Sequence, residues 1–320
     1  MTIKKSQLKQ WLIPFLKLLI ASCLILWLVR SGRFDLESLS HYQSPWIWLS
    51  GISLFLVLIG INSWRWKLLL GLESVEISLP RAYQLSLVGI FFNFFMPGGV
   101  GGDVVKAAYL MRDYQAKKWF IGWSILVDRI LGMLALFLYS GITGVLFYKK
   151  LPATLQMSVY SLSLMILFGL VSLVGILIFS PKKNIEKLLK SQPLLEKSLL
   201  PLFYFFQRPS KIVVPFLLSL VGQGLVMGIA ALLVFSAGVS LSLWMILLIF
   251  PFGFLATILP ISPAGIGVGQ AAFFFLFDKV AGQGEFGVLI ITFIQAIQFL
   301  VGLLGGLFFV LYKKETTTAN

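Results

Sequence analysis

The sequence has few charged residues, acids in particular, and almost none of the side chains that build metal sites and disulfides. Only 12% of its 320 residues are charged, with 12 Asp and Glu against 26 Lys and Arg, and Cys23 and His41 are the single cysteine and histidine. These numbers exclude a disulfide framework, a His/Cys metal cluster and a Cys-His or Ser-His-Asp hydrolase. Nucleotide loops are absent too, because Val104 stands where a dinucleotide loop needs its third glycine and no G-x-x-x-x-G-K run occurs. We therefore expect no metal, no cofactor and no catalytic residue.

Hydrophobic residues make up 58% of the chain, and its formal net charge is +14. A basic domain that binds nucleic acid needs a polar surface to carry its charge, and the charged share here is about half that of a globular protein. The Lys and Arg must instead lie in short polar stretches between long apolar runs, which is typical of membrane spans with cytoplasmic positive charge. The composition predicts an all-α polytopic membrane protein and excludes a soluble nucleic-acid binder.

Apolar runs of about 18 residues or more predict six full membrane spans. Two further apolar regions, Ala82–Leu110 and Leu241–Phe277, are interrupted by Pro and Gly at Met96–Gly102 and Leu259–Gly267. The pieces on either side are short for a crossing, and this density of Pro and Gly ends a helix. We predict two re-entrant hairpins of broken helices there. The six spans lie near Trp11–Val29, Pro45–Trp64, Trp119–Tyr148, Ser158–Phe179, Ile212–Phe235 and Glu285–Tyr312.

An internal repeat relates the two interrupted regions. Pro97–Gly101 aligns with Pro263–Gly267, and the two prolines lie 166 residues apart. The same offset relates the span beginning near Pro45 to one beginning near Lys211, and the span near Trp119 to the one near Glu285. Such repeats often mark the working parts of transporters. We predict one membrane domain over residues 1–320, with a first repeat half at 11–148 and a second at 149–320.

The distribution of basic residues predicts the orientation. With the N-terminus in the cytoplasm, six crossings and two returning hairpins, cytoplasmic segments hold 18 of the 26 Lys and Arg, and Arg65 and Arg81 are counted among them. An odd number of crossings in Leu241–Phe277 would move Lys313 and Lys314 outside. The positive-inside bias therefore favours cytoplasmic N- and C-termini and an inverted relation between the two halves.

The segment 181–211 joins the halves and alternates leucine with lysine. This pattern is typical of an interfacial amphipathic helix, and it also fits a basic linker attracted to anionic lipid. Both interpretations stay open.

Charged and polar residues inside the apolar regions are candidates for function, because such groups are costly at membrane depth. Asp103 and Lys106 share a helix face in the first hairpin, and Asp128 and Arg129 follow in the third span. Since adjacent residues point roughly 100° apart on a helix, Asp128 and Arg129 need different partners. One interpretation is a structural network that pairs Asp103 with Arg129 and Lys106 with Asp128. The other is a polar cavity lined by the same residues.

The glycine-rich breaks suit an anionic group, since the helix that follows presents unpaired N–H groups and a positive dipole end. Asp103 can cap the helix of the first hairpin, so we expect an anionic headgroup to favour the second hairpin together with Lys106 and Arg129. Asp103 and Asp128 would then bind a cationic group or a proton. The candidate substrate-binding residues are Asn93, Gly99, Gly101, Gly102, Asp103, Lys106, Asp128, Arg129, Ser262, Gly265, Gly267 and Gln270.

Three motifs together resemble the transmembrane region of lysylphosphatidylglycerol synthases, a flippase-like family. They are Asn93–Lys106, Val127–Gly132 and Leu259–Gln270, in the family's order. The resemblance implies a membrane part that moves lipid across the bilayer, here as a stand-alone member without the C-terminal aminoacyl-transfer domain. Many members carry Glu where Gln270 stands, and often an Arg in the last span, where this chain has Gln295 and Gln298. This departure weakens the case for a cationic aminoacyl-lipid as substrate.

From the sequence we expect a lipid translocase of the inner membrane, similar to flippases and scramblases, whose partners are membrane lipid headgroups. One alternative is a membrane scaffold that recruits a cytosolic lipid- or glycan-modifying enzyme through the segment 181–211. A less favoured alternative is a membrane-embedded lipid transferase that uses Asp103 and Asp128.

Overall fold

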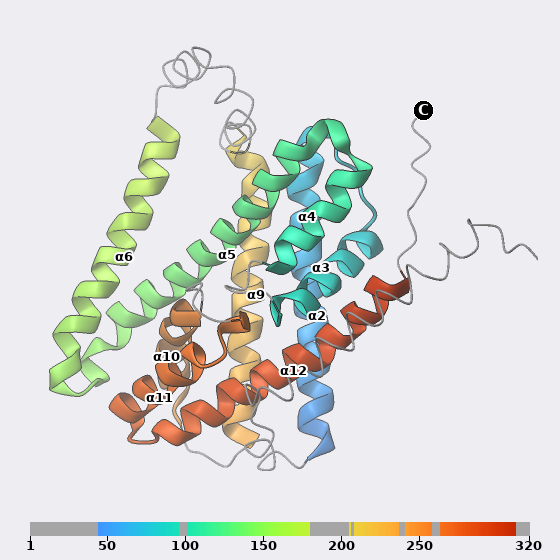
Figure 1. Ribbon diagram of the computed structural model, residues 1–320. Helices are drawn as coiled ribbons and strands as arrows, with labels where there is room; N and C mark the ends of the chain where they lie inside the picture. The colour runs from blue at the N-terminus through green and yellow to red at the C-terminus, as the bar shows by residue number, and fades with distance from the viewer. Residues whose placement is uncertain are drawn as a thin grey trace, which may run out of the picture.

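The computed structural model describes residues 44–95, 101–179, 205, 208–236, 241–257 and 263–311, where the regular structure is helical and no strand occurs (Figure 1). This confirms the predicted all-α fold. Short 3-10 turns extend several of the helices. The α-helices are α2 (Pro45–Leu70), α3 (Leu79–Asn93), α4 (Gly101–Asp113), α5 (Lys118–Phe147), α6 (Ala153–Phe179), α9 (Pro209–Ser236), α10 (Leu243–Thr257), α11 (Val268–Ala281) and α12 (Gly284–Leu311).

Five segments of the described chain are long and apolar enough to cross a membrane. They coincide with five of the six predicted spans, and the sixth, Trp11–Val29, lies outside the described residues. The chain is therefore a polytopic integral membrane protein, as predicted. The five segments are Pro45–Glu73, Gln115–Lys150, Ala153–Ser172, Ser210–Ser236 and Gly284–Leu311.

Both interrupted apolar regions fold into pairs of short helices, as expected of broken hairpins. The helix α3 packs against α4, and α10 packs against α11. These helices have 13 to 15 residues, or about 20 Å at 1.5 Å per residue, which is less than the roughly 30 Å of a hydrocarbon core. The hairpin tips at 96–100 and 258–262 lie outside the described residues.

A close backbone approach holds the first hairpin together. Gly102, near the start of α4, packs directly against the carbonyl group of Gly89 on α3, and a Cβ atom on Gly102 would overlap that carbonyl oxygen. The amide oxygen of Asn93 accepts a hydrogen bond from the Gly102 N–H at 2.9 Å. Gly102, a predicted substrate-binding residue, thus has a packing role that the sequence did not reveal.

The order of helices repeats at the predicted offset. Shifting α2, α3, α4 and α5 by 166 residues places their bounds within two residues of those of α9, α10, α11 and α12. The packing repeats as well: α3 contacts α12, and α10 contacts α5, while α2 and α9 contact each other. This exchange of partners is what a pseudo-two-fold axis between α2 and α9 produces. The predicted division between residues 148 and 149 stays a prediction.

The helices α2 and α9 run antiparallel, so the two repeats are inverted. Arg65, late in α2, contacts Ser219 early in α9, whereas Leu58 lies beside Gly222, further along α9. Figure 1 shows the same relation, with α2 ascending beside a descending α9. An inverted pair of repeats with broken helices is the predicted architecture.

Little of the connecting segment 181–211 is described. Phe205 stacks on Phe120 of α5 with ring centroids 4.9 Å apart, and a terminal N–H of Arg208 donates to the Leu72 carbonyl at 2.9 Å. The end of the connection is therefore fixed against the first half. The predicted amphipathic helix falls on residues outside the described part.

We expect Gly102→Ala to lower the stability of the protein by about 1–3 kcal/mol, because the added methyl group must push α4 away from Gly89. Thermal unfolding of the purified protein in detergent measures the effect. Gly228→Ala in α9 is the matched control, since a Cβ atom there meets no other atom within 4 Å, and it should leave stability unchanged or slightly higher. Equal unfolding temperatures for both variants would contradict the packing role of Gly102.

Candidate functional site

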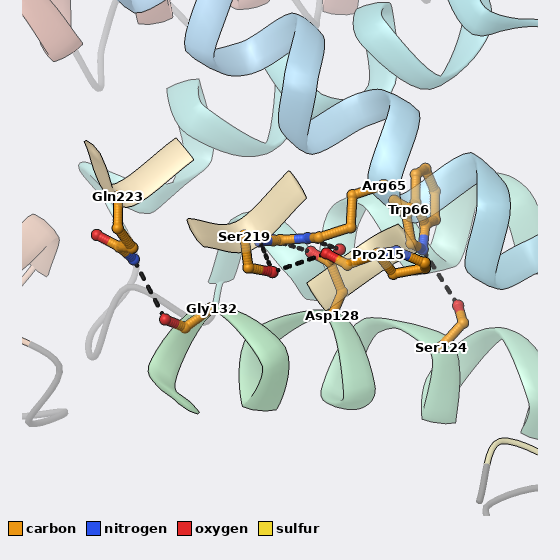
Figure 2. A network of polar contacts seen from close by, with 8 residues as sticks. All are labelled: Arg65, Trp66, Ser124, Asp128, Gly132, Pro215, Ser219 and Gln223. Atoms are coloured by element: carbon orange, nitrogen blue, oxygen red, sulfur yellow. Dashed lines mark hydrogen bonds and ion pairs between the residues drawn. The ribbon is translucent and has the colours of Figure 1, made fainter. Parts of the chain in front are cut away.

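A buried ion pair lies where α2, α5 and α9 cross (Figure 2). Arg65 of α2 donates two hydrogen bonds to the carboxylate of Asp128 on α5, at 2.7 and 2.9 Å. A third N–H of Arg65 donates to the hydroxyl of Ser219 on α9 at 2.9 Å. Both side chains are almost fully removed from solvent. One guanidinium group therefore links three helices, two from the first repeat half and one from the second.

Neighbouring polar groups support this ion pair. The Ser219 hydroxyl lies 3.0 Å from the Pro215 carbonyl, and the side-chain amide of Gln223 donates to the Gly132 carbonyl at 3.2 Å. Gly132 lies beside the guanidinium group, where an added Cβ atom would make ordinary van der Waals contact with Arg65, 3.6 Å from its nearest nitrogen. Figure 2 shows Pro215, Ser219 and Gln223 on α9 facing α2 and α5.

A second ion pair joins the first hairpin to the same span. Arg129 of α5 donates to the carboxylate of Asp103 near the start of α4. This pair is more open than the first, with 33% of the Arg129 side chain and 21% of the Asp103 side chain exposed. The adjacent residues Asp128 and Arg129 thus bind different partners on different helices, as their angular separation predicted.

Lys106 lies near both ion pairs. Its ammonium group is 3.8 Å from the centroid of the Trp66 ring, and the residue is only 6% exposed. The ammonium is close enough to interact electrostatically with the charged groups of both ion pairs. Trp66 is itself held in place by a 3.1 Å hydrogen bond from its ring N–H to the Ser124 hydroxyl. We call Arg65, Asp103, Lys106, Asp128 and Arg129 the charged cluster.

One of the two ion pairs expected from the sequence is confirmed, and the other is wrong. Asp103 does pair with Arg129, but Asp128 pairs with Arg65 and not with Lys106. The sequence placed Arg65 in a cytoplasmic connection because the apolar run ends at Trp64. The structure instead continues α2 to Leu70 and buries Arg65, so this residue does not serve as an orienting charge.

Two signals point to the residues that sequence reasoning missed. Pro215, Ser219 and Gln223 follow one another at intervals of four in an otherwise apolar span, which places them on one helix face. Arg65 lies between two tryptophans, with apolar residues resuming after Lys67. The polar face of the span near Ile212–Phe235 offers hydrogen-bond acceptors, and an arginine just inside the span near Pro45–Trp64 needs them. Together these two patterns could have indicated a contact between the spans.

The second hairpin carries a neutral network in place of charges. The side-chain oxygen of Gln270 accepts the Gly267 N–H at 2.7 Å, so it caps the start of α11. The Gln270 amide also donates to Gln295 at 2.7 Å and to Thr292 at 3.2 Å, both on α12. Gln295 in turn lies 3.4 Å from the Ala264 carbonyl. The Gly267 N–H at this N-terminus is therefore already bound to Gln270, and the expected anion site at the second hairpin stays a prediction.

The remaining predicted residues divide between the two hairpins. Gly101 starts α4 and is buried, Gly265 is buried beside Thr257, and Gly267 has a φ of +88° at the start of α11. Gly99 and Ser262 lie outside the described residues. The structure therefore brings Asp103, Lys106, Asp128 and Arg129 together, and it groups Gly265, Gly267 and Gln270 separately.

At the repeat offset of 166, none of the five cluster residues has a charged counterpart. Gly269 and Gln295, the counterparts of Asp103 and Arg129, lie against each other, so the repeat preserves the position of this contact without its charges. The charged cluster is confined to the first half. Its residues Arg65, Asp103, Lys106, Asp128 and Arg129 correspond to Ala231, Gly269, Ala272, Ile294 and Gln295.

A further ion pair closes the base of the first hairpin. Arg81, near the start of α3, lies 3.2 Å from Asp113 at the end of α4, and both side chains are buried. Its position at the two helix ends fixes the spacing of α3 and α4. Within the described ranges, no group of three or more His, Cys, Asp or Glu residues is arranged to hold a metal ion.

Comparison with known proteins gives two matches. The family model described as the lysylphosphatidylglycerol synthase TM region matches residues 15–306. A "UPF0104 membrane protein" of Methanothermobacter thermautotrophicus is 28% identical over 117 residues, which cover 36% of this chain and 33% of the relative. The matched part is thus about a third of the relative's length. No solved structure matches the chain.

We expect Asp128→Ala to destabilise the protein by about 3–5 kcal/mol, because Arg65 would be left buried without its carboxylate. Replacing both residues, as Arg65→Met with Asp128→Leu, should recover most of this loss. Thermal unfolding in detergent tests both expectations.

Asp278→Asn is the control for this experiment. Asp278 pairs with Lys279 at 3.5 Å on α11, where both side chains are about half exposed, and the change should cost less than about 1 kcal/mol. A loss in Asp128→Ala no larger than that in Asp278→Asn would show that the Arg65 pair does not hold the three helices.

Proposed function

This chain belongs to the lysylphosphatidylglycerol synthase transmembrane region family, and we propose that it is a lipid translocase that moves a phospholipid or another polar-headed lipid between the leaflets of the bacterial inner membrane. We propose a transporter and not an enzyme. The headgroup passes along the charged cluster while the acyl chains remain in the bilayer.

The position of the charged cluster along α4 and α5 is the observation that carries this proposal. Asp103 lies ten residues before Asp113, the last residue of α4, and Asp128 lies ten residues after Lys118, the first residue of α5. At 1.5 Å per residue, each carboxylate is about 15 Å along its helix, or half the thickness of a hydrocarbon core. Charged residues at such depth are costly and typical of substrate pathways.

The partial exposure of Arg129 and Asp103 supports the same interpretation. A purely structural ion pair is best shielded on all sides, as Arg65 and Asp128 are. Arg129 and Asp103 instead present about a third and a fifth of their side chains outward. A headgroup that reaches the hairpin contacts this pair before the buried one. Arg129 and Asp103 then provide hydrogen-bond partners that the lipid interior cannot supply.

The movement we propose is downhill exchange between leaflets. Both carboxylates of the cluster are bound by arginines, so each already has a cationic partner within the protein. We also place both termini in the cytoplasm, since removing the buried Arg65 from the count leaves the excess of basic residues on that side in place.

Reconstitution into liposomes tests the function. With phospholipids that carry a fluorescent label, we expect the wild-type protein to exchange lipid between leaflets faster than protein-free liposomes do. Asp103→Asn combined with Arg129→Gln should slow exchange about tenfold, because the headgroup then loses the two partly exposed charges of the cluster, and each factor of ten corresponds to about 1.4 kcal/mol. Asp278→Asn combined with Lys279→Gln, on the exposed pair of α11, should exchange lipid like the wild type.

Two outcomes would overturn the proposal. One is wild-type exchange indistinguishable from that of empty liposomes for anionic, zwitterionic and cationic lipids alike. The other is a lipid product of altered mass after incubation with lipid and a candidate donor, which would favour a membrane-embedded transferase. The unfolding temperature of each variant shows whether it is folded.

A further inference from the structure

The charged cluster has one cation in excess. It contains three basic residues and two carboxylates, and each carboxylate is bound by an arginine. Asp128 is engaged by two N–H groups of Arg65, and Asp103 by Arg129. Lys106 therefore holds the charge that the cluster itself does not balance.

Among the described residues, Lys106 has no carboxylate partner of its own, since both carboxylates of the cluster are bound by arginines. In the part of the chain that the structure describes, Lys106 takes part in no hydrogen bond or ion pair, and its contact is with the Trp66 ring. An aromatic face attracts an ammonium group only modestly, whereas an unbalanced charge at membrane depth is costly. The Trp66 ring alone does not offset that cost.

The position of Lys106 on its helix adds to the positive potential. It lies five residues after the first residue of α4, a helix of 13 residues. Long side chains on a helix lean towards its N-terminus, and the N-terminus carries a partial positive charge. The helix end and the ammonium group thus attract the same kind of ligand.

We propose that Lys106 binds the phosphate of a lipid headgroup whose net charge is negative. This inference rests on the proposed function and names its substrate class. One phosphodiester carries the single negative charge that balances the cluster. A cationic headgroup meets two carboxylates that arginines already occupy, and no acid at the counterpart positions Gly269 and Ala272.

Lipid binding to the purified protein in detergent tests the proposal without requiring transport. The probes are phosphatidylglycerol, phosphatidylcholine and lysyl-phosphatidylglycerol with the same acyl chains, each in competition with fluorescent phosphatidylglycerol. We expect the wild type to bind phosphatidylglycerol about tenfold or more tightly than the cationic lipid, with phosphatidylcholine between them. Inorganic phosphate should not displace the lipid at millimolar concentration, because it lacks the acyl chains.

The variants assign the effect to Lys106. Lys106→Met should weaken phosphatidylglycerol binding about tenfold and remove the preference over the cationic lipid, whereas Lys106→Arg should stay within about threefold of the wild type. Lys279→Met, at a half-exposed lysine of α11, should bind like the wild type. Since Lys106→Met removes a buried charge without orphaning a partner, we expect it to fold, and its unfolding temperature confirms this.

Several results would overturn the inference. They are equal binding of anionic and cationic lipids by the wild type, unchanged binding by Lys106→Met, and displacement of the lipid by phosphate alone. Headgroup selectivity without leaflet exchange would leave this inference standing and refute translocation. Leaflet exchange without selectivity would refute this inference alone.

Discussion

Arg65 carries a full charge at a place where neither lipid nor water can solvate it, and the arrangement of the first half follows from that constraint. Its guanidinium group is satisfied by Asp128 on α5 and Ser219 on α9, because an unpaired charge there costs several kcal/mol. The helices α2 and α9 are also equivalent in the two repeats, and they contact each other at the pseudo-two-fold axis. The ion pair therefore fixes the interface between the two halves as well as the position of α5.

Close backbone contacts fix the remaining helices. Lipid tails are as apolar as leucine, so helices in a membrane gain most from small residues that let their backbones approach. Gly302, Gly305 and Gly306 on α12 lie against α3, and Gly305 packs directly on the Leu87 carbonyl. The helix α3 is thus held by α12 from the second half, while the ion pairs hold α4 and α5. The first hairpin is fixed on both sides by different forces.

Much of this architecture follows from the sequence, because bilayer thickness sets the length of an apolar run and Pro with Gly ends a helix. The separation of Asp128 from Arg129 follows from helical geometry alone. The burial of Arg65 could not be predicted from the sequence. A basic residue at the end of an apolar run has the pattern of an orienting charge whether its side chain faces water or protein. The position of Lys106 on Trp66 could not be predicted either, because the two residues lie forty positions apart on helices whose crossing only the fold defines.

The asymmetry of the repeat bears directly on how a lipid could leave the site. Two identical halves would offer a headgroup the same charges on both sides of the membrane centre. Here the first half offers Lys106, and the second offers the neutral amides of Gln270 and Gln295. A ligand bound tightly along its whole path would be trapped, since equal binding to every state lowers no barrier. Under the proposed function, a charged site in one half and neutral hydrogen-bonding groups in the other would let the headgroup bind at one point and leave at the next.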